Sequence, residues 1–348
     1  MNEADVYQRL AGKVNFPKSK FIRQVLRKLV TPDEGEMLLA LPASLSELAQ
    51  KFQMDEAMVE QKLDEFVRKG VCMPLEKEGV LRHFCVNNII QVHDATIHAT
   101  IKKKYEPVQD EIVRLWQNFR ETEWFEMVRM REEFGGSQGR VAPLRGAIED
   151  TSQLLPYEDV AAIIEEAPAI AVVDCPCRWL RVQEGECDKP TFVCLSFTPN
   201  AVKYIVDRGI GKRLSVDEAY EILDVTAEAG LIPLPGGAPR VRNMCFCCTD
   251  CCIVFRPHVK YGYAGPGPSR FQAVVDTDLC EGCQTCVERC QFDAVEMVKV
   301  PGSKKLKSSV DPEKCYGCGA CVIKCPNGAL SLDLVKPVEH IPLTTGSL

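Results

Sequence analysis

The sequence predicts an α+β protein made of several domains, and three observations support this. Its 348 residues are enough for two or three domains. Capping signals and helical periodicity dominate the first part of the chain, whereas short alternating segments typical of strands return near its end. Its 19 cysteines concentrate in the second half. We expect an N-terminal domain, a helical linker, a mainly helical cysteine-rich middle domain, a small α+β C-terminal domain and a tail, at residues 1–98, 99–139, 140–262, 270–335 and 336–348.

The N-terminal domain should contain three helices followed by a β-ribbon, over residues 31–90. Ser44 and Glu47 form a capping box, the reciprocal pair of hydrogen bonds that opens many helices. A second periodic segment, residues 55–69, is followed by a glycine, and residues 71–86 alternate as two strands. This order of elements resembles a winged helix-turn-helix domain.

The charge of this domain argues against DNA binding. In a winged helix the segment at residues 55–69 would enter a DNA groove, where affinity comes largely from neutralised phosphates. Its acidic residues outnumber its basic ones: Asp55, Glu56, Glu60, Asp64 and Glu65 against Lys62, Arg68 and Lys69. The net charge of −7 points the same way. We therefore expect a protein-docking or structural role and no nucleic-acid partner. A redox-sensing regulator that uses this domain is the alternative.

The linker should be one long amphipathic helix. Over residues 100–133, the apolar residues Val108, Ile112, Leu115 and Phe119 recur at helical spacing. A helix with such a stripe normally packs against a neighbouring domain, and we expect the same here.

Eight cysteines of the C-terminal domain form two runs with the spacing C-x2-C-x2-C-x3-C, namely Cys280, Cys283, Cys286 and Cys290, then Cys315, Cys318, Cys321 and Cys325. Each run ends in a short alternating strand, so the segment is an internal repeat. A disulfide framework or two zinc sites are the alternatives, but zinc sites usually close with two CxxC pairs or with histidines. Gly282 and Gly317 precede the second cysteine of each run, where a Cβ would crowd a bound cluster.

Residues 270–335 resemble the two-cluster bacterial ferredoxins, which bind two [4Fe–4S] clusters through this cysteine pattern. The fourth cysteine of each run crosses to the other cluster. We therefore expect cluster I on Cys280, Cys283, Cys286 and Cys325, and cluster II on Cys315, Cys318, Cys321 and Cys290. Pro326 follows the last ligand, whereas the first run has Gln291 at the equivalent place.

Nine more cysteines lie in the middle domain, namely Cys175, Cys177, Cys187 and Cys194, then Cys245, Cys247, Cys248, Cys251 and Cys252. A buried strand at residues 170–173 should precede the first set, and a helical spacer with a capping box at Ser215 and Glu218 should separate the two sets. Unligated, so many thiolates would be prone to oxidation and would repel one another.

We expect these cysteines to hold one or two further [4Fe–4S] clusters, or zinc, on a subset that the sequence does not fix. Cys175 with Cys177, and Cys245 with Cys248, are plausible ligand pairs. Not every member of the adjacent pairs Cys247-Cys248 and Cys251-Cys252 should reach one cluster, because neighbouring side chains tend to point apart.

The middle domain also resembles a group of multi-cysteine, ferredoxin-bearing iron–sulfur proteins of anaerobic metabolism. The matching elements are Leu155-Pro156-Tyr157-Glu158, Cys175-Pro176-Cys177-Arg178, Cys187-Asp188-Lys189-Pro190, Cys194-Leu195 and the block Cys245–Cys252. With the C-terminal repeat, the resemblance spans residues 140–335. It implies an iron–sulfur protein without a defined substrate or catalytic residue. A positive charge such as Arg178 beside a cluster would raise its reduction potential.

Together these features predict a carrier that passes single electrons through two [4Fe–4S] clusters and an additional metal centre, to or from a flavoprotein or other oxidoreductase. The sequence has no apolar run near the ~20 residues of a membrane span and no recognisable secretory leader. We therefore expect a cytoplasmic protein whose reduced thiols bind metal. A redox enzyme with an iron–sulfur site in the middle domain is a further alternative, although no phosphate loop is present and no small-molecule substrate is inferred.

Overall fold

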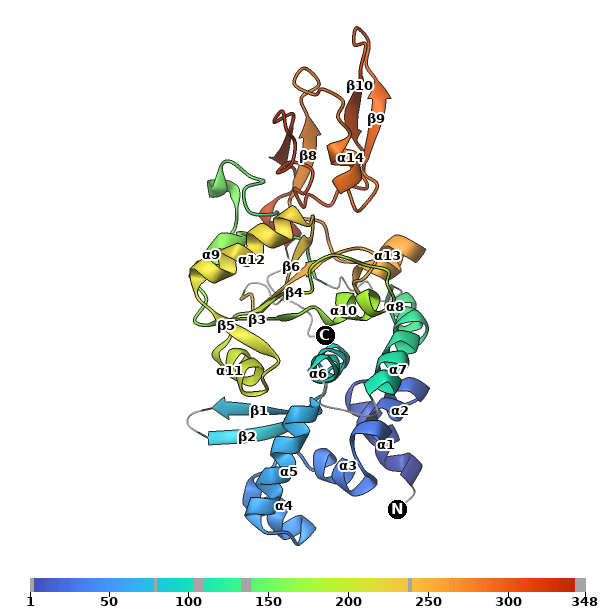
Figure 1. Cartoon of the computed structure of the whole chain (residues 1–348), viewed down its shortest axis with the longest axis vertical. Helices are drawn as coiled ribbons and strands as arrows, with labels where there is room; N and C mark the ends of the chain where they lie inside the picture. The colour runs from blue at the N-terminus through green and yellow to red at the C-terminus, as the bar shows by residue number, and fades with distance from the viewer. Residues whose placement is uncertain are drawn as a thin grey trace. The chain divides into compact units, whose positions relative to one another are not determined.

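The structure, a computed structural model, describes residues 3–77, 80–102, 109–132, 139–236, 240–263 and 265–341. These residues form helices and small sheets, which confirms the α+β fold class (Figure 1). The chain divides into two compact units, Met1–Met127 with Asn200–Lys212, and Val128–Pro199 with Arg213–Ser347. Parts of the expected linker (103–108 and 133–138) and most of the expected tail (342–348) lie outside the described residues.

The first unit contains the expected winged-helix order of three helices and a β-hairpin. These elements are α3 (Pro32–Leu39), α4 (Leu45–Phe52), α5 (Glu56–Lys69), β1 (Cys72–Lys77) and β2 (Val80–Cys85). The Ser44–Glu47 capping box opens α4 as expected, and Gly70 ends α5 in the left-handed conformation. The strands pair antiparallel with Cys72 opposite Cys85.

Further helices surround the winged-helix elements in this unit. They are α1 (Glu3–Lys13), α2 (Lys20–Leu29), α6 (Ile89–Ile101), α7 (Gln109–Glu121) and α11 (Pro199–Asp207). Trp116 of α7 is fully buried and donates its indole N–H to Thr96 Oγ1 of α6 at 2.9 Å. Arg208, just after α11, donates to the carbonyls of Arg68 and Ala95, which joins the segment 200–212 to this unit.

The expectation of one long helix over residues 100–133 is wrong. α7 ends at Glu121, and a separate helix, α8 (Glu123–Glu132), follows. At the break, the Thr122 hydroxyl donates to the Asn118 carbonyl at 2.6 Å, and the Thr122 N–H bonds the Phe119 carbonyl, three residues back. A threonine that bonds the backbone in this way competes with the regular helical ladder, so the apolar periodicity continues while the helix does not.

The middle segment is built on a five-stranded sheet in the order β5-β3-β4-β7-β6. The strands are β3 (Ile170–Asp174), β4 (Phe192–Ser196), β5 (Gly211–Leu214), β6 (Ile232–Gly236) and β7 (Asn243–Cys247). The helices α9 (Val160–Glu165), α10 (Pro176–Gln183), α12 (Val216–Glu228) and α13 (Phe255–Tyr261) accompany them. The strand before Cys175 and the capping box of α12 agree with expectation, whereas the rest of the sheet was not anticipated.

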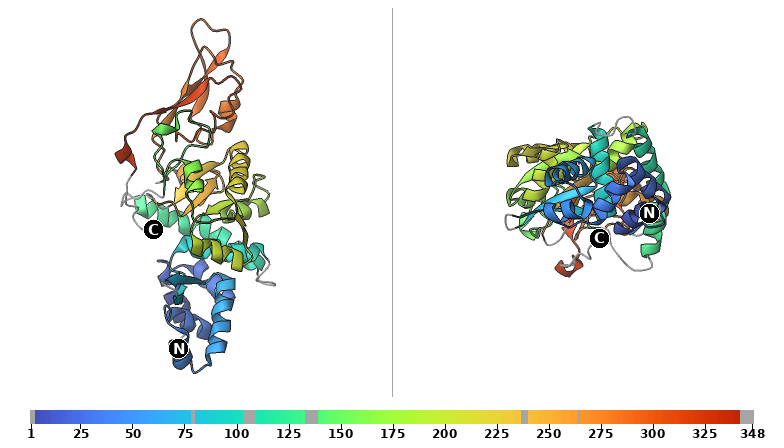
Figure 2. Two further views of the ribbon diagram at one scale, coloured as in Figure 1. Left: turned by 90° about the vertical axis from the view of Figure 1, so that its left-hand side faces the viewer. Right: turned by 90° about the horizontal axis from the view of Figure 1, so that it is seen from below.

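The C-terminal segment consists of two antiparallel strand pairs around one short helix. Its elements are β8 (Phe271–Val275), α14 (Thr285–Arg289), β9 (Val295–Lys299), β10 (Leu306–Val310) and β11 (Leu330–Leu334). Figure 2 shows this segment in orange and red. β8 pairs with β11 and β9 with β10. Each cysteine run is therefore followed by a strand, as the repeat predicts, at β9 and at β11.

No described helix is both long and apolar enough to cross a membrane.

Candidate metal centres

Each of the two C-terminal cysteine runs lies in a loop that contains a tightly packed glycine. Gly282 and Gly317 both have positive φ, at 74° and 63°. A Cβ on Gly317 would lie 2.0 Å from the Phe271 carbonyl oxygen, and one on Gly282 would lie 2.5 Å from the Leu306 carbonyl oxygen. In the structure, the crowding that requires glycine at these two positions comes from a neighbouring strand, and crowding of a bound cluster stays a prediction.

Backbone N–H groups point at the sulfurs in a repeated pattern. The Ala294 N–H donates to Cys290 Sγ at 3.3 Å, and the Ala329 N–H donates to Cys325 Sγ at 3.2 Å. Both donors follow their cysteine by four residues, so the internal repeat extends to these hydrogen bonds. Cys280 and Cys315 accept in the same way from the N–H groups of Ser308 and Ala273. Such donors stabilise the negative charge of thiolates that bind a cluster, so the loops fit an anionic iron–sulfur centre.

The cysteines of the two runs intermix in space. One pocket is lined by Cys280, Cys283 and Cys286 together with Cys325 from the second run. Burial, with a smaller contribution from the nearby Cys290 and Cys315, raises the pKa of the Cys318 thiol to about 12. A thiol with so high a pKa loses its proton only when a nearby cation stabilises the thiolate. A bound metal ion provides that stabilisation.

Six of the nine middle cysteines form a closed ring of thiols, which we call the six-thiol ring. In order round the ring they are Cys175, Cys177, Cys252, Cys247, Cys245 and Cys194, each hydrogen-bonded to the next. They come from separate elements, because Cys175 and Cys177 lie at the start of α10, Cys194 on β4, and Cys245 and Cys247 on β7. The fold thus gathers sulfurs that are up to 77 residues apart in the sequence.

Hydrogen bonds between thiols shift the pKa values of the cysteines in the six-thiol ring. Bonds from Cys177 and Cys194 lower the pKa of Cys175, and bonds from Cys194 and Cys247 lower that of Cys245 to about 6. Cys252 has a lowered pKa for the same reason, since it accepts from Cys177 and Cys247. The same bonds raise the pKa of Cys194 and Cys247, so the ring favours the thiolate, the form in which cysteine binds a metal, at alternate positions: Cys175, Cys252 and Cys245.

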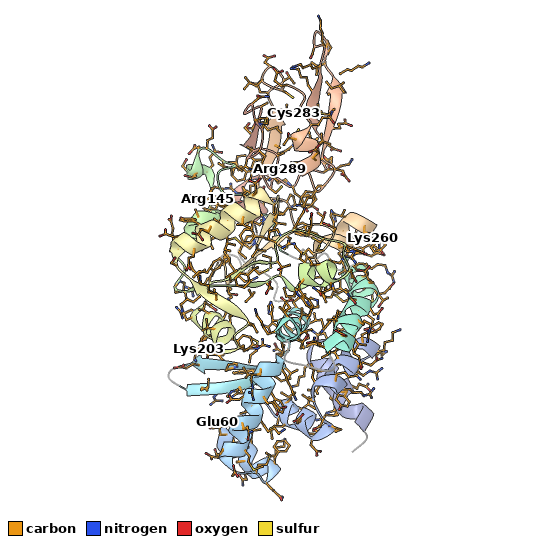
Figure 3. The ribbon with its side chains drawn as sticks, viewed as in Figure 1. Glu60, Arg145, Lys203, Lys260, Cys283 and Arg289 are labelled. Carbon is orange, nitrogen blue, oxygen red and sulfur yellow. The ribbon has the colours of Figure 1, made fainter. Side chains whose placement is uncertain are left out.

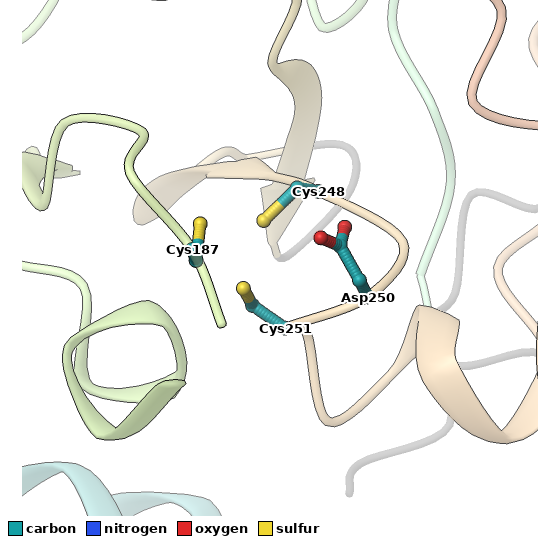
Figure 4. A group of neighbouring side chains, drawn as sticks. All are labelled: Cys187, Cys248, Asp250 and Cys251. Carbon is teal, nitrogen blue, oxygen red and sulfur yellow. The ribbon is translucent and has the colours of Figure 1, made fainter. Parts of the chain in front are cut away.

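The other three middle cysteines form a separate and tighter group with an aspartate. The ligand atoms of Cys187, Cys248, Asp250 and Cys251 all lie within 4.8 Å of one another (Figure 4). We call this group the Cys3Asp group. Cys248 and Cys251 belong to it while their neighbours Cys247 and Cys252 belong to the six-thiol ring, so each adjacent pair diverges. Cys245 therefore lies in the six-thiol ring and Cys248, just beyond the end of β7, in the Cys3Asp group, so their pairing on one metal stays a prediction.

Arg178 lies fully buried between these groups and anchors one of them. Its Nε donates to Cys248 Sγ at 3.3 Å, and its Nη1 and Nη2 donate to the carbonyls of Pro190 and Phe246. The negative charge of Cys175 and Cys248 raises the Arg178 pKa against the effect of burial. The guanidinium therefore remains charged and supplies a positive charge beside the sulfurs.

Two family models match parts of the chain. Residues 279–330 match the 4Fe–4S dicluster domain. We call the C-terminal segment, residues 270–335, the dicluster domain after this similarity. Residues 41–87 match the FeoC-like transcriptional regulators, in agreement with the winged-helix elements. No curated protein matches the chain. Both matches leave the middle cysteines unassigned.

The dicluster domain is joined to the middle segment by contacts that sequence reasoning missed. Arg289 donates from Nη1 to the Glu228 carbonyl at 3.0 Å and from Nη2 to the Ala227 carbonyl at 2.6 Å, at the end of α12 (Figure 3). Gln291 donates to the Gly230 carbonyl and accepts from the Thr249 N–H at 2.9 Å. One sign of this contact is visible in the sequence: Gln291 follows Cys290 at the place where Pro326 follows Cys325 in the second run.

An aromatic cluster lies at the same junction. Phe292 stacks on Tyr316 with ring centroids 4.1 Å apart, and Phe255 packs against both. His258 accepts from the Tyr316 hydroxyl at 2.6 Å and bonds the Tyr263 carbonyl through its other ring nitrogen. His258 therefore links Tyr316 to the Tyr263 backbone and has a structural role.

Proposed function

We propose that this protein is an iron–sulfur electron carrier, or the carrier subunit of an oxidoreductase. In this proposal Cys280, Cys283, Cys286 and Cys325 hold one [4Fe–4S] cluster, and Cys315, Cys318, Cys321 and Cys290 hold a second. Four thiols of the six-thiol ring hold a third. Bound clusters supply reversible one-electron chemistry, and the chain supplies the ligands and the spacing between them.

The observation that carries this proposal is a continuous apolar contact between the dicluster domain and the six-thiol ring. Cys318 packs in the same hydrophobic cluster as Cys247 and Cys252, together with Phe255, Phe292 and Tyr316. A cluster held by Cys318 and one held by the ring would therefore be separated by close-packed side chains, without intervening solvent.

The exposure of Cys283 supports electron exchange with a partner protein at cluster I. Cys283 is exposed, whereas Cys280 and Cys286 of the same run are buried. A partner that docks over Cys283 would come close to cluster I. We infer the order partner, cluster I, cluster II, six-thiol ring, with a flavoprotein or other cytosolic oxidoreductase as the partner.

Anaerobic purification with metal and sulfide analysis tests this function. We expect about twelve iron atoms and twelve sulfides per chain, since each cubane contains four of each. Electron paramagnetic resonance during a redox titration should show three reversible one-electron centres. Iron below about four per chain, or no reversible reduction, would contradict the proposal.

A second function, redox-responsive regulation, is favoured by the match of residues 41–87 to FeoC-like regulators. The ion pairs of α5 weigh against DNA binding. Lys62 pairs with Glu34 at 2.6 Å, and Lys69 pairs with Glu65 at 2.6 Å, so two of its basic side chains are already engaged. Salt-sensitive, sequence-selective binding of genomic fragments in a gel shift would favour the regulator over the carrier.

A further inference from the structure

We propose that the Cys3Asp group is a mononuclear zinc site, separate from every iron–sulfur cluster. Its ligands would be the thiolates of Cys187, Cys248 and Cys251 and the carboxylate of Asp250. This inference deepens the description of the middle segment but does not rest on electron transfer, because zinc has no redox chemistry.

The size of the group decides between one metal ion and a cubane. In a tetrahedral zinc site with Zn–S bonds of about 2.3 Å, the sulfurs lie about 3.8 Å apart. In a cubane each thiolate binds a different iron, so the sulfurs spread to about 6 Å apart. The four ligand atoms here all lie within 4.8 Å of one another, which fits one ion and is too small for a cubane.

The dicluster domain gives an internal standard for this argument. Within the described part of the chain, no other set of three or more cysteine, histidine or acidic side chains has all its ligand atoms so close together. The ferredoxin-type cysteines, which face cubane-sized sites, fail the same condition. The six-thiol ring also fails it as a set, but its neighbouring thiols are hydrogen-bonded, so they would have to move apart to hold a cubane. The Cys3Asp group is thus a different kind of site in the same structure.

The local sequence also has the form of a zinc site. Cys248-Thr249-Asp250-Cys251 is a CxxC knuckle, in which the Cys252 N–H bonds the Cys248 carbonyl at 3.1 Å to close the turn. Cys187 comes from the loop after α10 and supplies the third sulfur. Asp250 is exposed, so the fourth ligand lies at the solvent side of the group.

The charge of the site is partly balanced by the protein. Three thiolates and one carboxylate exceed the charge of a zinc ion by two negative charges. The buried Arg178, which donates to Cys248 Sγ, offsets one of them. Hydrogen bonds to ligand atoms from outside the coordination shell are typical of metal sites and orient their ligands.

The position of the site suggests what zinc does. Cys247 and Cys252, on either side of the CxxC knuckle, belong to the six-thiol ring. An ion that ties Cys187 to the knuckle would fix both of these neighbours, and so would prepare the ring for its own metal.

Metal analysis of variants tests the assignment. Anaerobically purified protein should contain about one zinc per chain. Cys187→Ser should lose that zinc while iron and sulfide stay within error, whereas Cys194→Ser should lose iron and sulfide and keep zinc. Cys85→Ser, which replaces an isolated thiol of the first unit, should change neither. Loss of about four iron atoms with Cys187→Ser, or wild-type protein without zinc, would overturn the proposal.

Cobalt substitution provides a measurement that does not depend on the folding of a cysteine variant. Wild-type protein in which cobalt(II) replaces zinc should show the visible d–d bands of a tetrahedral site and near-ultraviolet sulfur-to-cobalt charge transfer. Asp250→Asn should shift the d–d bands, whereas Asp188→Asn, the matched change beside Cys187, should leave them in place. Octahedral cobalt bands, or spectra that are identical in all three proteins, would contradict three-sulfur, one-carboxylate ligation.

Discussion

The cysteines of the dicluster domain and those of the middle segment differ in their main hydrogen-bond partners, although Cys252 of the middle segment also accepts from the Val254 N–H. In the dicluster domain, sulfurs such as Cys290 and Cys325 accept hydrogen bonds from backbone N–H groups in the same loop. In the middle segment, thiols bond one another, and a buried arginine bonds Cys248. The first arrangement depends on backbone conformation, within the loop for Cys290 and Cys325 and in a neighbouring strand for Cys280 and Cys315. The second depends on how the side chains of separate strands and helices are brought together.

This difference predicts different weak points in the two regions. A small backbone change should destroy a dicluster site while the middle segment survives. In the middle segment, the loss of one buried side chain should matter more than a change in backbone freedom.

The largest effect is expected from Gly317→Ala. The new Cβ would lie 2.0 Å from the Phe271 carbonyl, so the loop that carries Cys315 and Cys318 must move. We expect the loss of about four iron atoms per chain. Gly328→Ala is the matched control, because Gly328 has nearly the same φ, 61° against 63°, but no atom within 4 Å of the new Cβ.

Iron and sulfide analysis of both variants measures the contrast. Gly328→Ala should cost only about 1 kcal/mol of backbone strain and keep its iron. Equal iron loss in the two variants would show that positive φ alone, and not the contact with β8, limits this loop.

The second prediction compares the alkylation rates of thiols outside the proposed metal sites with those of the dicluster ligands. Burial raises the pKa of Cys72 to about 12 and that of Cys85 to about 11. At pH 8 about one Cys72 in ten thousand is then a thiolate, so alkylation should be slower than for an ordinary cysteine by about a thousandfold. Because the pKa is raised, the rate should climb about tenfold per pH unit above pH 8.

Mass spectrometry of protein alkylated after metal removal checks this. Cys283 is exposed, and a hydrogen bond with Thr285 lowers its pKa, so it should react first in metal-free protein. In unfolded protein Cys72 and Cys283 should react at similar rates. Rapid labelling of Cys72 in the folded protein would contradict its burial.

The dicluster domain could be predicted from the sequence because its ligands are consecutive. Cys280 to Cys290 form one loop and a short helix, so their spacing alone carries the pattern. The capping boxes at Ser44 and Ser215 were readable for the same reason, since each involves residues three positions apart. In contrast, the break at Thr122 depends on which backbone carbonyl one hydroxyl bonds, and no periodicity reveals that.

The division of the middle cysteines could be foreseen only in part. Alternation along a strand places Cys245 and Cys247 on one face of β7, and this rule would have separated Cys245 from Cys248. The five-stranded sheet that brings Cys194 beside Cys245 depends on pairings between distant strands, with Leu195 opposite Met244. The metal-ligating role proposed for Asp250 required its distance to three sulfurs, which no spacing gives.

The third prediction concerns the middle segment and is a loss of folding stability. Arg178→Leu would leave the Pro190 and Phe246 carbonyls without their donor and Cys248 without its cation. Removal of one partner from such a buried charged network typically costs about 3–5 kcal/mol. Arg181→Leu, one turn along α10, breaks pairs with Glu184 and Glu186 that are partly exposed, and should cost about 1 kcal/mol or less.

Urea unfolding under anaerobic conditions compares these two variants. If Arg178→Leu is no less stable than Arg181→Leu, the guanidinium does not anchor the sulfur groups. The cost of Arg178→Leu should also shrink in metal-free protein, because protonated thiols need no neighbouring cation.

The smallest effect is expected where the two regions meet, from Gln291→Leu. This change leaves the cysteine spacing intact but removes the bonds from Gln291 to the Gly230 carbonyl and the Thr249 N–H. Unpaired polar groups that remain partly buried typically cost about 1–3 kcal/mol. The iron content should not change, because no ligand is touched.

The junction that Gln291 supports connects the loop after Cys290 with the loop between Cys248 and Asp250. Gln291→Leu should therefore slow electron transfer between the dicluster domain and the six-thiol ring more than it alters either centre alone. Rapid-freeze resonance spectra after a reductant pulse would follow this step, with Gln284→Leu, in the same cysteine run but outside the junction, as the control. Unchanged transfer, with the stability loss present, would mean that the aromatic contact of Phe292 and Tyr316 holds the two regions at working distance without the glutamine.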